Sequence, residues 1–192
     1  ALAELVAREG RMPLVLTGRA GLPERRAWDA WLAEHGAEDA TSRRIRAVRG
    51  LEELGVEVLV CAADAADERA MQAAIEAARA RFGRIAGVIH AAGLPGAGLL
   101  SLKTPAEARL VLAPKVSGTQ VLERLLDAEP LEFLALCSSL ATAVTAVGQV
   151  DYFAANAYLD AWAASQRARH PERLTVAINW DAWNEAAMAL ET

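Results

Sequence analysis

The chain alternates short apolar runs with longer segments of helical periodicity. The run LEFLALC is almost continuously apolar, as expected for a strand that is covered on both faces. Strands are expected at Leu14–Thr17, Glu57–Cys61, Gly87–His90, Leu131–Cys137 and Leu174–Asn179. Helices are expected at Ala1–Glu9, Glu24–His35, Thr41–Leu54, Glu68–Phe82, Pro105–Leu126 and Val150–Arg169. This alternation predicts an α/β fold with a mainly parallel sheet.

The length favours one domain. A chain of 192 residues is long enough for a substantial core, and the sequence shows no internal repeat or interdomain linker. Residues 1–192 are therefore expected to form a single domain. The more polar segment 22–50 is expected to be an inserted helical segment, with Trp28 and Trp31 as its anchors.

Composition and charge exclude several classes of protein. Hydrophobic residues make up 54% of the chain, so disorder is not expected, and the net charge of −5 argues against nucleic acid as a partner. No apolar segment approaches the roughly 18 residues of a membrane span, and no signal peptide is recognisable. Cys61 and Cys137 lack metal-ligand spacing and are expected to be reduced. We therefore expect a cytoplasmic protein without a metal site or a membrane association.

Four polar residues form the main candidate site. Tyr152 and Asn156 are four residues apart and share one helical face, and Ser139 ends the preceding strand. A phenol is a weak acid, with an ordinary pKa of about 10, and a nearby ammonium lowers that pKa by stabilising the phenolate. Lys115 is the candidate for the ammonium. Together these residues could donate a proton during carbonyl reduction.

Each of these residues also has a structural interpretation. Tyr152, like Tyr158 on the same helix, could be a packing aromatic. The serine pair could cap the turn after the strand, with Ser138 as the candidate cap. A single lysine at position 115 within a helix would normally be a surface charge.

Several motifs occur in an order and spacing that resemble one enzyme family. They are LVLTGR at 14–19, GVIHAAG at 87–93, APKVSGT at 113–119, CSS at 137–139, DYFAANAYLDA at 151–161 and INWDAW at 178–183. The pattern resembles the ketoreductase domains of modular, type I polyketide synthases, in the short-chain dehydrogenase/reductase superfamily. The resemblance covers nearly the whole chain and implies a Rossmann-like, doubly wound parallel sheet.

The resemblance also implies a reaction and a role for each residue. NADPH would reduce the β-keto group of an intermediate bound to an acyl carrier protein, next to neighbouring synthase domains. Tyr152 would act as general acid, Ser139 would bind the carbonyl oxygen, Lys115 would lower the tyrosine pKa and bind the nicotinamide ribose, and Asn156 would complete a polar relay. The polyketide enzymes resemble this chain in having lysine and asparagine exchanged relative to most of the superfamily.

Further residues are candidates for binding the cofactor. Arg19 ends LVLTGR, where a cation near the adenosine ribose favours the 2′-phosphate of NADPH over NADH. Asp64 follows the next strand and resembles the residue that binds adenine in the family, although it could instead cap a helix, a role for which Asp67 is better placed. The remaining candidates are Ala65, Ala91, Ala92 and Gly93. His90 is assigned no catalytic role.

The resemblance further implies a strand that this sequence does not contain. In the family, a central strand and a glycine-rich turn that holds the dinucleotide phosphates precede the first helix. Without them, the strands starting near Leu14 and Glu57 should be separated from the other three. We therefore expect a larger polypeptide, truncated here at both ends, that supplies the missing N-terminal strand. One continuous sheet built from these residues alone would contradict this.

Two alternative functions and the stereochemistry remain open. The chain could be an inactive structural module of the ketoreductase type, or a stand-alone reductase of 3-oxoacyl thioesters or small ketones. B-type ketoreductases carry Leu-Asp-Asp where this chain has Leu94, Pro95, Gly96 and Ala97. A-type enzymes carry tryptophan where this chain has Val144. The absence of the acidic pair favours the A type.

Overall fold

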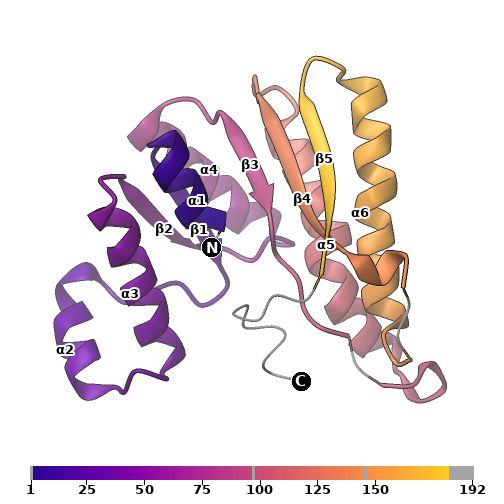
Figure 1. Ribbon diagram of the computed structural model, residues 1–192, viewed down its shortest axis with the longest axis horizontal. Helices are drawn as coiled ribbons and strands as arrows, with labels where there is room; N and C mark the ends of the chain where they lie inside the picture. Colours follow the sequence, from indigo (N-terminus) through magenta and orange to yellow (C-terminus); the bar gives the residue numbers. More distant parts are fainter. Residues whose placement is uncertain (1, 97, 145–146, 182–192) are drawn as a thin grey trace. The chain divides into compact units, whose positions relative to one another are not determined.

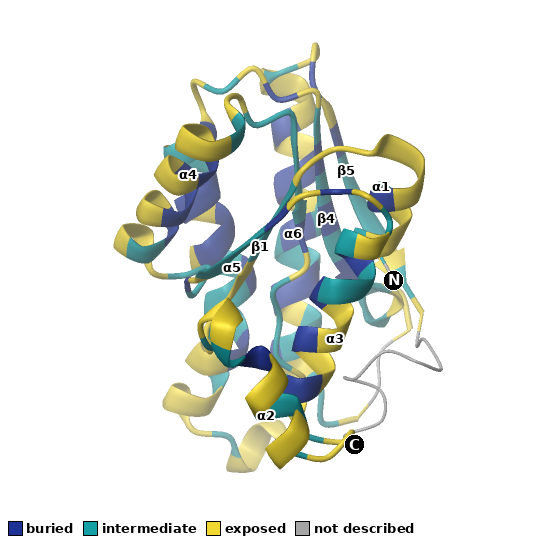
Figure 2. Ribbon diagram, turned by 90° about the vertical axis from the view of Figure 1, so that its left-hand side faces the viewer, coloured by how far each residue is buried: buried dark blue, intermediate teal, exposed yellow. Residues whose placement is uncertain are grey.

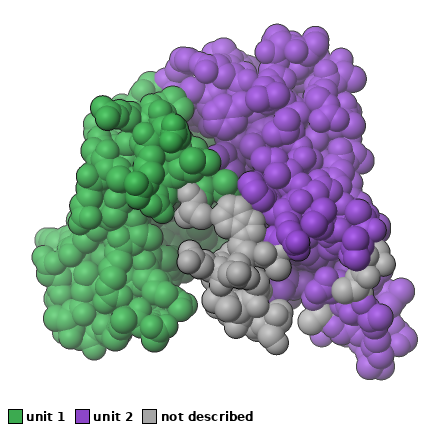
Figure 3. Space-filling model, in the orientation of Figure 1, with its two compact units in different colours: residues 1–64, 72–83 green, residues 65–71, 84–192 purple. Residues whose placement is uncertain are grey.

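The chain folds into two compact units, each with its own parallel sheet. The computed structural model describes residues 2–96, 98–144 and 147–181. Unit 1 comprises residues 1–64 and 72–83, and unit 2 comprises residues 65–71 and 84–192 (Figure 3).

Unit 1 is built on two parallel strands. Strand β1 (Leu14–Gly18) pairs with β2 (Val58–Ala62), and the register runs from Leu14 opposite Val58 to Gly18 opposite Ala62. The helical elements are α1 (Leu2–Gly10), a 3₁₀ turn (Arg25–Ala27), α2 (Trp28–Glu34), α3 (Ala40–Glu53) and the larger part of α4 (Glu68–Phe82).

The core of unit 1 forms around α3. Ile45, Val48 and Leu51 are three residues apart and therefore lie on one face of this helix, whose buried positions are dark blue in Figure 2. They pack with Ala7, Trp28, Val56 and Val58. The indole nitrogen of Trp28 donates a hydrogen bond to the Pro23 carbonyl at 2.9 Å, so its polar edge is satisfied although the ring is buried.

Unit 2 has a three-stranded parallel sheet. The strand order is β3 (Gly87–His90), β4 (Phe133–Ser139) and β5 (Leu174–Trp180). The helices are α5 (Pro105–Leu126) and α6 (Val150–Arg169), with 3₁₀ turns at Leu100–Leu102 and Leu140–Thr142. Helix α6 covers β4 and β5 and lies beside α5 (Figure 1).

Sequence-coded signals fix the start of α5 and the packing of α6. Thr104 and Glu107 form a reciprocal capping box, and Pro105 occupies the first helical turn. On α6, Leu159, Trp162 and Ala163 are buried against the sheet. The shared core consists of Leu134, Leu136, Leu159, Trp162 and Ala163.

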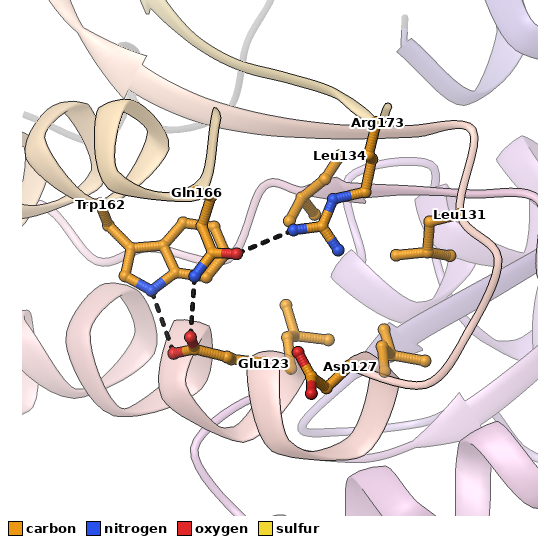
Figure 4. Close-up of a pocket in the computed structure, with 9 residues that line it drawn as sticks. Glu123, Asp127, Leu131, Leu134, Trp162, Gln166 and Arg173 are labelled. Carbon is orange, nitrogen blue, oxygen red and sulfur yellow. Dashed lines mark hydrogen bonds between the residues drawn. The ribbon is translucent and has the colours of Figure 1, made fainter. Parts of the chain in front are cut away.

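A polar network joins α5, α6 and the start of β5 (Figure 4). The Glu123 carboxylate accepts hydrogen bonds from the Trp162 indole at 3.3 Å and the Gln166 amide at 2.7 Å. The Arg173 guanidinium, buried beside them, donates to the Gln166 oxygen at 2.9 Å. These residues line a cavity with room for about one water molecule. It lies where β4 and β5 begin, at the opposite sheet edge from the one at which parallel α/β proteins bind ligands.

The predicted fold class and element order are confirmed. Glu68–Phe82, Pro105–Leu126 and Val150–Arg169 form helices with the predicted bounds. One helix was expected at Glu24–His35. This segment instead begins with a 3₁₀ turn, in which the Ala27 amide donates a hydrogen bond to the Glu24 carbonyl three residues earlier. Ala1 lies outside the described residues.

Two further expectations concern the sheet and the membrane. The strands starting near Leu14 and Glu57 form a sheet separate from the other three strands, as predicted. Across the described parts of the chain, no helix is both long and apolar enough to cross a membrane.

Candidate active site

Unit 2 brings the four proton-transfer candidates to the carboxyl edge of its sheet. Ser139 is the last residue of β4, Lys115 lies in α5, and Tyr152 and Asn156 lie in the first two turns of α6. In Figure 1 the arrowheads of β3, β4 and β5 point to the edge where α6 begins. Ligands of parallel α/β sheets bind beyond this edge.

Lys115 is a buried cation, not a surface lysine. It is 3% exposed, and its ammonium donates a hydrogen bond to the Cys137 carbonyl at 2.6 Å. Burial lowers its pKa from 10.5 to about 8. A Cβ at Gly93 would lie 3.1 Å from the Lys115 Cε atom, so the glycine lets the loop after β3 approach the lysine closely. The site therefore contains an ammonium held against low-dielectric surroundings.

His90 supports the helical turn that carries Lys115. Its ring is buried, and the Nε2 atom lies 3.1 Å from the Pro114 carbonyl. Burial, together with the neighbouring Lys115 charge, lowers the His90 pKa to about 4. The neutral ring can therefore donate its N–H to the carbonyl, and His90 links β3 to α5.

Tyr152 and Asn156 are one helical turn apart and differ in burial. Tyr152 is half-buried, whereas Asn156 is completely buried. The Asn156 amide donates to the Tyr152 carbonyl at 2.7 Å, and its side-chain oxygen is buried without a hydrogen-bond partner. Tyr158 packs against the core shared by α6 and β4, but Tyr152 is not among the described residues of that core. The packing interpretation thus suits Tyr158 and not Tyr152.

The two serines have different roles. Ser139 caps the 3₁₀ turn, since its hydroxyl oxygen accepts a hydrogen bond from the Ala141 amide at 3.2 Å. Ser138 instead donates to the Asn156 carbonyl at 3.3 Å, so the expectation that Ser138 is the cap is wrong. A hydroxyl that accepts one hydrogen bond keeps its proton available. Ser139 can therefore cap the turn and still donate to a substrate oxygen.

The expected relay is not closed by protein atoms alone. Among the described residues, the Lys115 ammonium makes no hydrogen bond to the side chain of Asn156 or of Tyr152. Within the described part of the chain, its ammonium donates to the backbone carbonyl of Cys137. The unpaired Asn156 oxygen is the kind of buried acceptor that usually binds water.

The cofactor candidates lie in both units. In unit 1, Arg19 is exposed just after β1, and Asp64 follows β2. The register of Gly18 opposite Ala62 places these two residues at the same sheet edge. Asp67 accepts a hydrogen bond from the Ala70 amide at 3.1 Å and so caps α4, as predicted.

The other cofactor candidates belong to unit 2. Ala91, Ala92 and Gly93 follow β3. Ala65 packs under α5, where a Cβ at Gly118 would lie 3.1 Å from the Ala65 Cβ atom. No cluster of His, Cys, Asp and Glu suited to a metal occurs among the residues with described positions.

Sequence reasoning missed an ion pair beside Tyr152. The Lys103 ammonium lies 2.6 Å from the Asp151 carboxylate, and the two side chains are only 5% and 3% exposed. Asp151 lies directly before Tyr152, but no local sequence signal pairs it with Lys103, which is 48 positions away. The positions of the two stereochemical motifs are also partly described. At the position of the B-type motif, Leu94 and Pro95 precede the buried Gly96, and Ala97 lies outside the described residues. Val144, at the position of the A-type tryptophan, is exposed.

Comparison of the sequence with known proteins identifies a family and several relatives. A family model described as KR domain matches residues 1–185. A phenolphthiocerol/phthiocerol polyketide synthase of Mycobacterium tuberculosis is 38% identical over 192 residues, which is 99% of this chain but 10% of that protein. The polyketide synthase PksL of Bacillus subtilis is 37% identical over 184 residues, which is 91% of this chain and 4% of that protein. The chain therefore spans a tenth or less of the length of these relatives.

Solved structures of other proteins resemble the fold of this chain. An N-terminal ketoreductase from the macrolactin assembly line superposes with a TM-score of 0.81 at 31% identity, covering 95% of this chain and 34% of that one. An NAD⁺-bound xylitol dehydrogenase, at 18% identity and a TM-score of 0.72 over 92% of this chain and 63% of that one, shares the fold alone.

Proposed function

Because this chain belongs to the ketoreductase (KR) domain family of type I polyketide synthases, we propose that it reduces the β-keto group of a polyketide intermediate bound to an acyl carrier protein, with NADPH as hydride donor. The product is a β-hydroxyacyl thioester. The observation that carries the proposal is the buried ammonium of Lys115, at the same sheet edge as Ser139, Tyr152 and Asn156.

Tyr152 supplies the proton. NADPH, when bound, supplies the hydride for the β-carbon of the substrate. The carbonyl oxygen then gains negative charge and takes the phenolic proton of Tyr152, which leaves a phenolate. Tyr152 lies at the start of α6 and is half-buried, so part of its side chain is packed and part is accessible to a substrate, as this role requires.

Lys115 and Ser139 stabilise the charge that develops. With a pKa of about 8, Lys115 is mostly protonated at neutral pH, so it can favour the Tyr152 phenolate by charge. Its low-dielectric surroundings strengthen that effect. Ser139 donates its hydroxyl proton to the substrate oxygen. The unpaired Asn156 oxygen binds a water that links the relay towards Lys115.

The cofactor residues fit a phosphorylated dinucleotide. Arg19 is an exposed guanidinium at a strand end, which suits the 2′-phosphate of NADPH, and Asp64 lies at the same edge as a partner for adenine. Ala91, Ala92 and Gly93 follow β3 and are small, which suits close approach of the nicotinamide half, and Lys115 with Tyr152 binds the ribose next to it. Ala65 lies at the start of the segment that follows Asp64.

The buried lysine also weighs against an inactive module. A buried ammonium lowers stability, and an apolar side chain of similar length would pack at lower cost. A chain that had only to hold its shape would gain from Lys115 no more than one hydrogen bond to a backbone carbonyl, against the cost of burying a charge.

The test is direct detection of the product. The full-length protein is incubated with a β-ketoacyl thioester on its carrier protein and with NADPH or NADH, and the acyl chain is weighed by mass spectrometry. We expect a gain of two hydrogen atoms with NADPH, a large loss of product in Ser139→Ala, and no change in Ser165→Ala, an exposed serine on α6. A protein that binds NADPH yet leaves the keto group unreduced would overturn the proposal.

A further inference from the structure

A buried ion pair fastens the segment between β3 and α5 to the helix that carries Tyr152. Lys103 lies near the end of this segment, residues 91–104, and Asp151 lies in the first turn of α6. Their charged atoms are 2.6 Å apart, and the side chains are 5% and 3% exposed. Other cation–carboxylate pairs of unit 2 are much more exposed. In the pair Arg124–Glu68, for example, the side chains are 53% and 51% exposed.

One carboxylate serves both the segment and the tyrosine. The Asp151 Oδ2 atom binds Lys103, and the Oδ1 atom accepts a hydrogen bond from the Tyr152 amide at 2.9 Å. The backbone of Tyr152 is therefore tied to Lys103 through a single side chain. Because water hardly reaches the pair, the attraction is screened much less than at the surface.

Close packing strengthens the same connection at Gly96. A Cβ at this position would lie 2.4 Å from the Asp151 Oδ1 atom and 2.9 Å from the Tyr152 Cβ atom. Only glycine allows the segment to lie this close to the first turn of α6. A second approach occurs just before the helix, where a Cβ at Gly148 would lie 3.5 Å from the backbone of Gly98.

We propose that the Lys103–Asp151 ion pair is a positioning element that holds the first turn of α6 against the 91–104 segment and thereby fixes the reach of the Tyr152 phenol. This inference rests on the proposed reductase function. Neither residue need touch the substrate, because the effect reaches the reaction through the backbone of Tyr152.

The expected consequence is on the chemical step and not on substrate binding. A proton donor must lie within hydrogen-bond reach of the oxygen it protonates, and displacement of about 1 Å can lower a rate about a hundred-fold. The Tyr152 phenol is far more sensitive to such a displacement than the rest of the substrate site. Loss of the ion pair should therefore lower kcat and leave KM nearly unchanged.

The experiment uses a double variant that removes both charges of the ion pair. Lys103→Met with Asp151→Asn removes the ion pair but keeps an oxygen that can accept from the Tyr152 amide. Gly96→Ala perturbs the same contact independently, by sterics. Arg124→Gln is the control, because it breaks an exposed ion pair of similar length. Each variant of the full-length protein carries 3-fluorotyrosine at position 152 for fluorine NMR, and parallel samples with tyrosine are used for kinetics and thermal unfolding.

The proposal predicts the same pattern in both test variants. The comparison is made under conditions where more than about nine-tenths of each variant is folded. There, kcat should fall about tenfold or more while KM stays within about threefold of the wild-type value. The fluorine line of residue 152 should broaden or split. The Arg124→Gln protein should match the wild type in kinetics and in fluorine line shape.

Other results would overturn the positioning role. A narrow, unshifted fluorine line with unchanged kcat in the double variant would do so, and so would a kcat that falls only in proportion to the folded fraction. If the wild type reduces no β-keto substrate, the proposed function fails, and the fluorine spectra still decide whether the ion pair positions Tyr152.

Discussion

Replacing Lys115 by methionine should change how the stability of the protein depends on pH. Burial lowers the Lys115 pKa from 10.5 to about 8, so the folded state binds this proton less tightly than the unfolded state. That difference corresponds to about 3 kcal/mol, since each pKa unit is worth about 1.4 kcal/mol. The figure is not reduced by solvent screening because the side chain is 3% exposed.

The pH window follows from the two pKa values. Below pH 8 both states hold the proton, and the full cost of burying the charge is present. Between pH 8 and 10.5 the unfolded state holds the proton while the folded state releases it, so stability rises with pH. Relative to Lys115→Met, the wild type should therefore gain about 2.5 kcal/mol between about pH 7 and about pH 10.

Urea unfolding at several pH values measures this gain. Methionine also removes the hydrogen bond to the Cys137 carbonyl, but the pH dependence of that bond is already contained in the folded-state pKa of Lys115, and the rest of the loss cancels when the two pH values are compared. Groups common to both proteins cancel as well. Arg124→Gln, an exposed change on the same helix, should show no such trend. A wild-type minus Lys115→Met difference that stays constant over this pH range would refute the argument that Lys115 is a buried charge.

Two further substitutions test the proposed role of Arg19 and the polar network of unit 2. Arg19→Glu should lower kcat/KM with NADPH about tenfold or more and hardly change it with NADH, as steady-state kinetics with both cofactors would show, and equal losses would contradict the assignment. Glu123→Ala removes the acceptor for Trp162, Gln166 and Arg169, and should lower the free energy of unfolding by about 2 kcal/mol. Activity per folded molecule should be unchanged, and an unaltered urea midpoint would contradict this role.

Sequence patterns predicted the long helices best. The helix Pro105–Leu126 has an amphipathic pattern with a capping box at its start, so both its existence and its beginning were visible in the sequence. The 3₁₀ turn at Arg25–Ala27 was not, because a tighter turn at a helix start leaves no periodic signal in so few residues. The split of the strands into two sheets was predicted only through the family resemblance.

The members of the candidate site were proposed from the sequence, whereas their contacts were not. Ser139, Lys115, Tyr152 and Asn156 were selected by type, by spacing and by the family resemblance, and their roles stay predictions. The partner that holds Lys115 was not, because it is the backbone carbonyl of Cys137, and a carbonyl has no sequence signature.

The ion pair beside the tyrosine was missed for a related reason. Lys103 and Asp151 are 48 positions apart in sequence, and nothing in the local pattern of either residue indicates the other. Only the packing of the 91–104 segment against α6 brings them together.

We propose Tyr152 as the proton donor for reduction of a β-keto group. The most direct test is kcat for NADPH oxidation with a β-ketoacyl thioester in Tyr152→Phe, with Tyr158→Phe as control. Tyr158 lies on the same helix but packs against the core. We predict that Tyr152→Phe lowers kcat about a hundred-fold or more, with the control close to the wild type. A Tyr152→Phe protein that keeps its rate within a few-fold of the wild type would show that Tyr152 is not the proton donor.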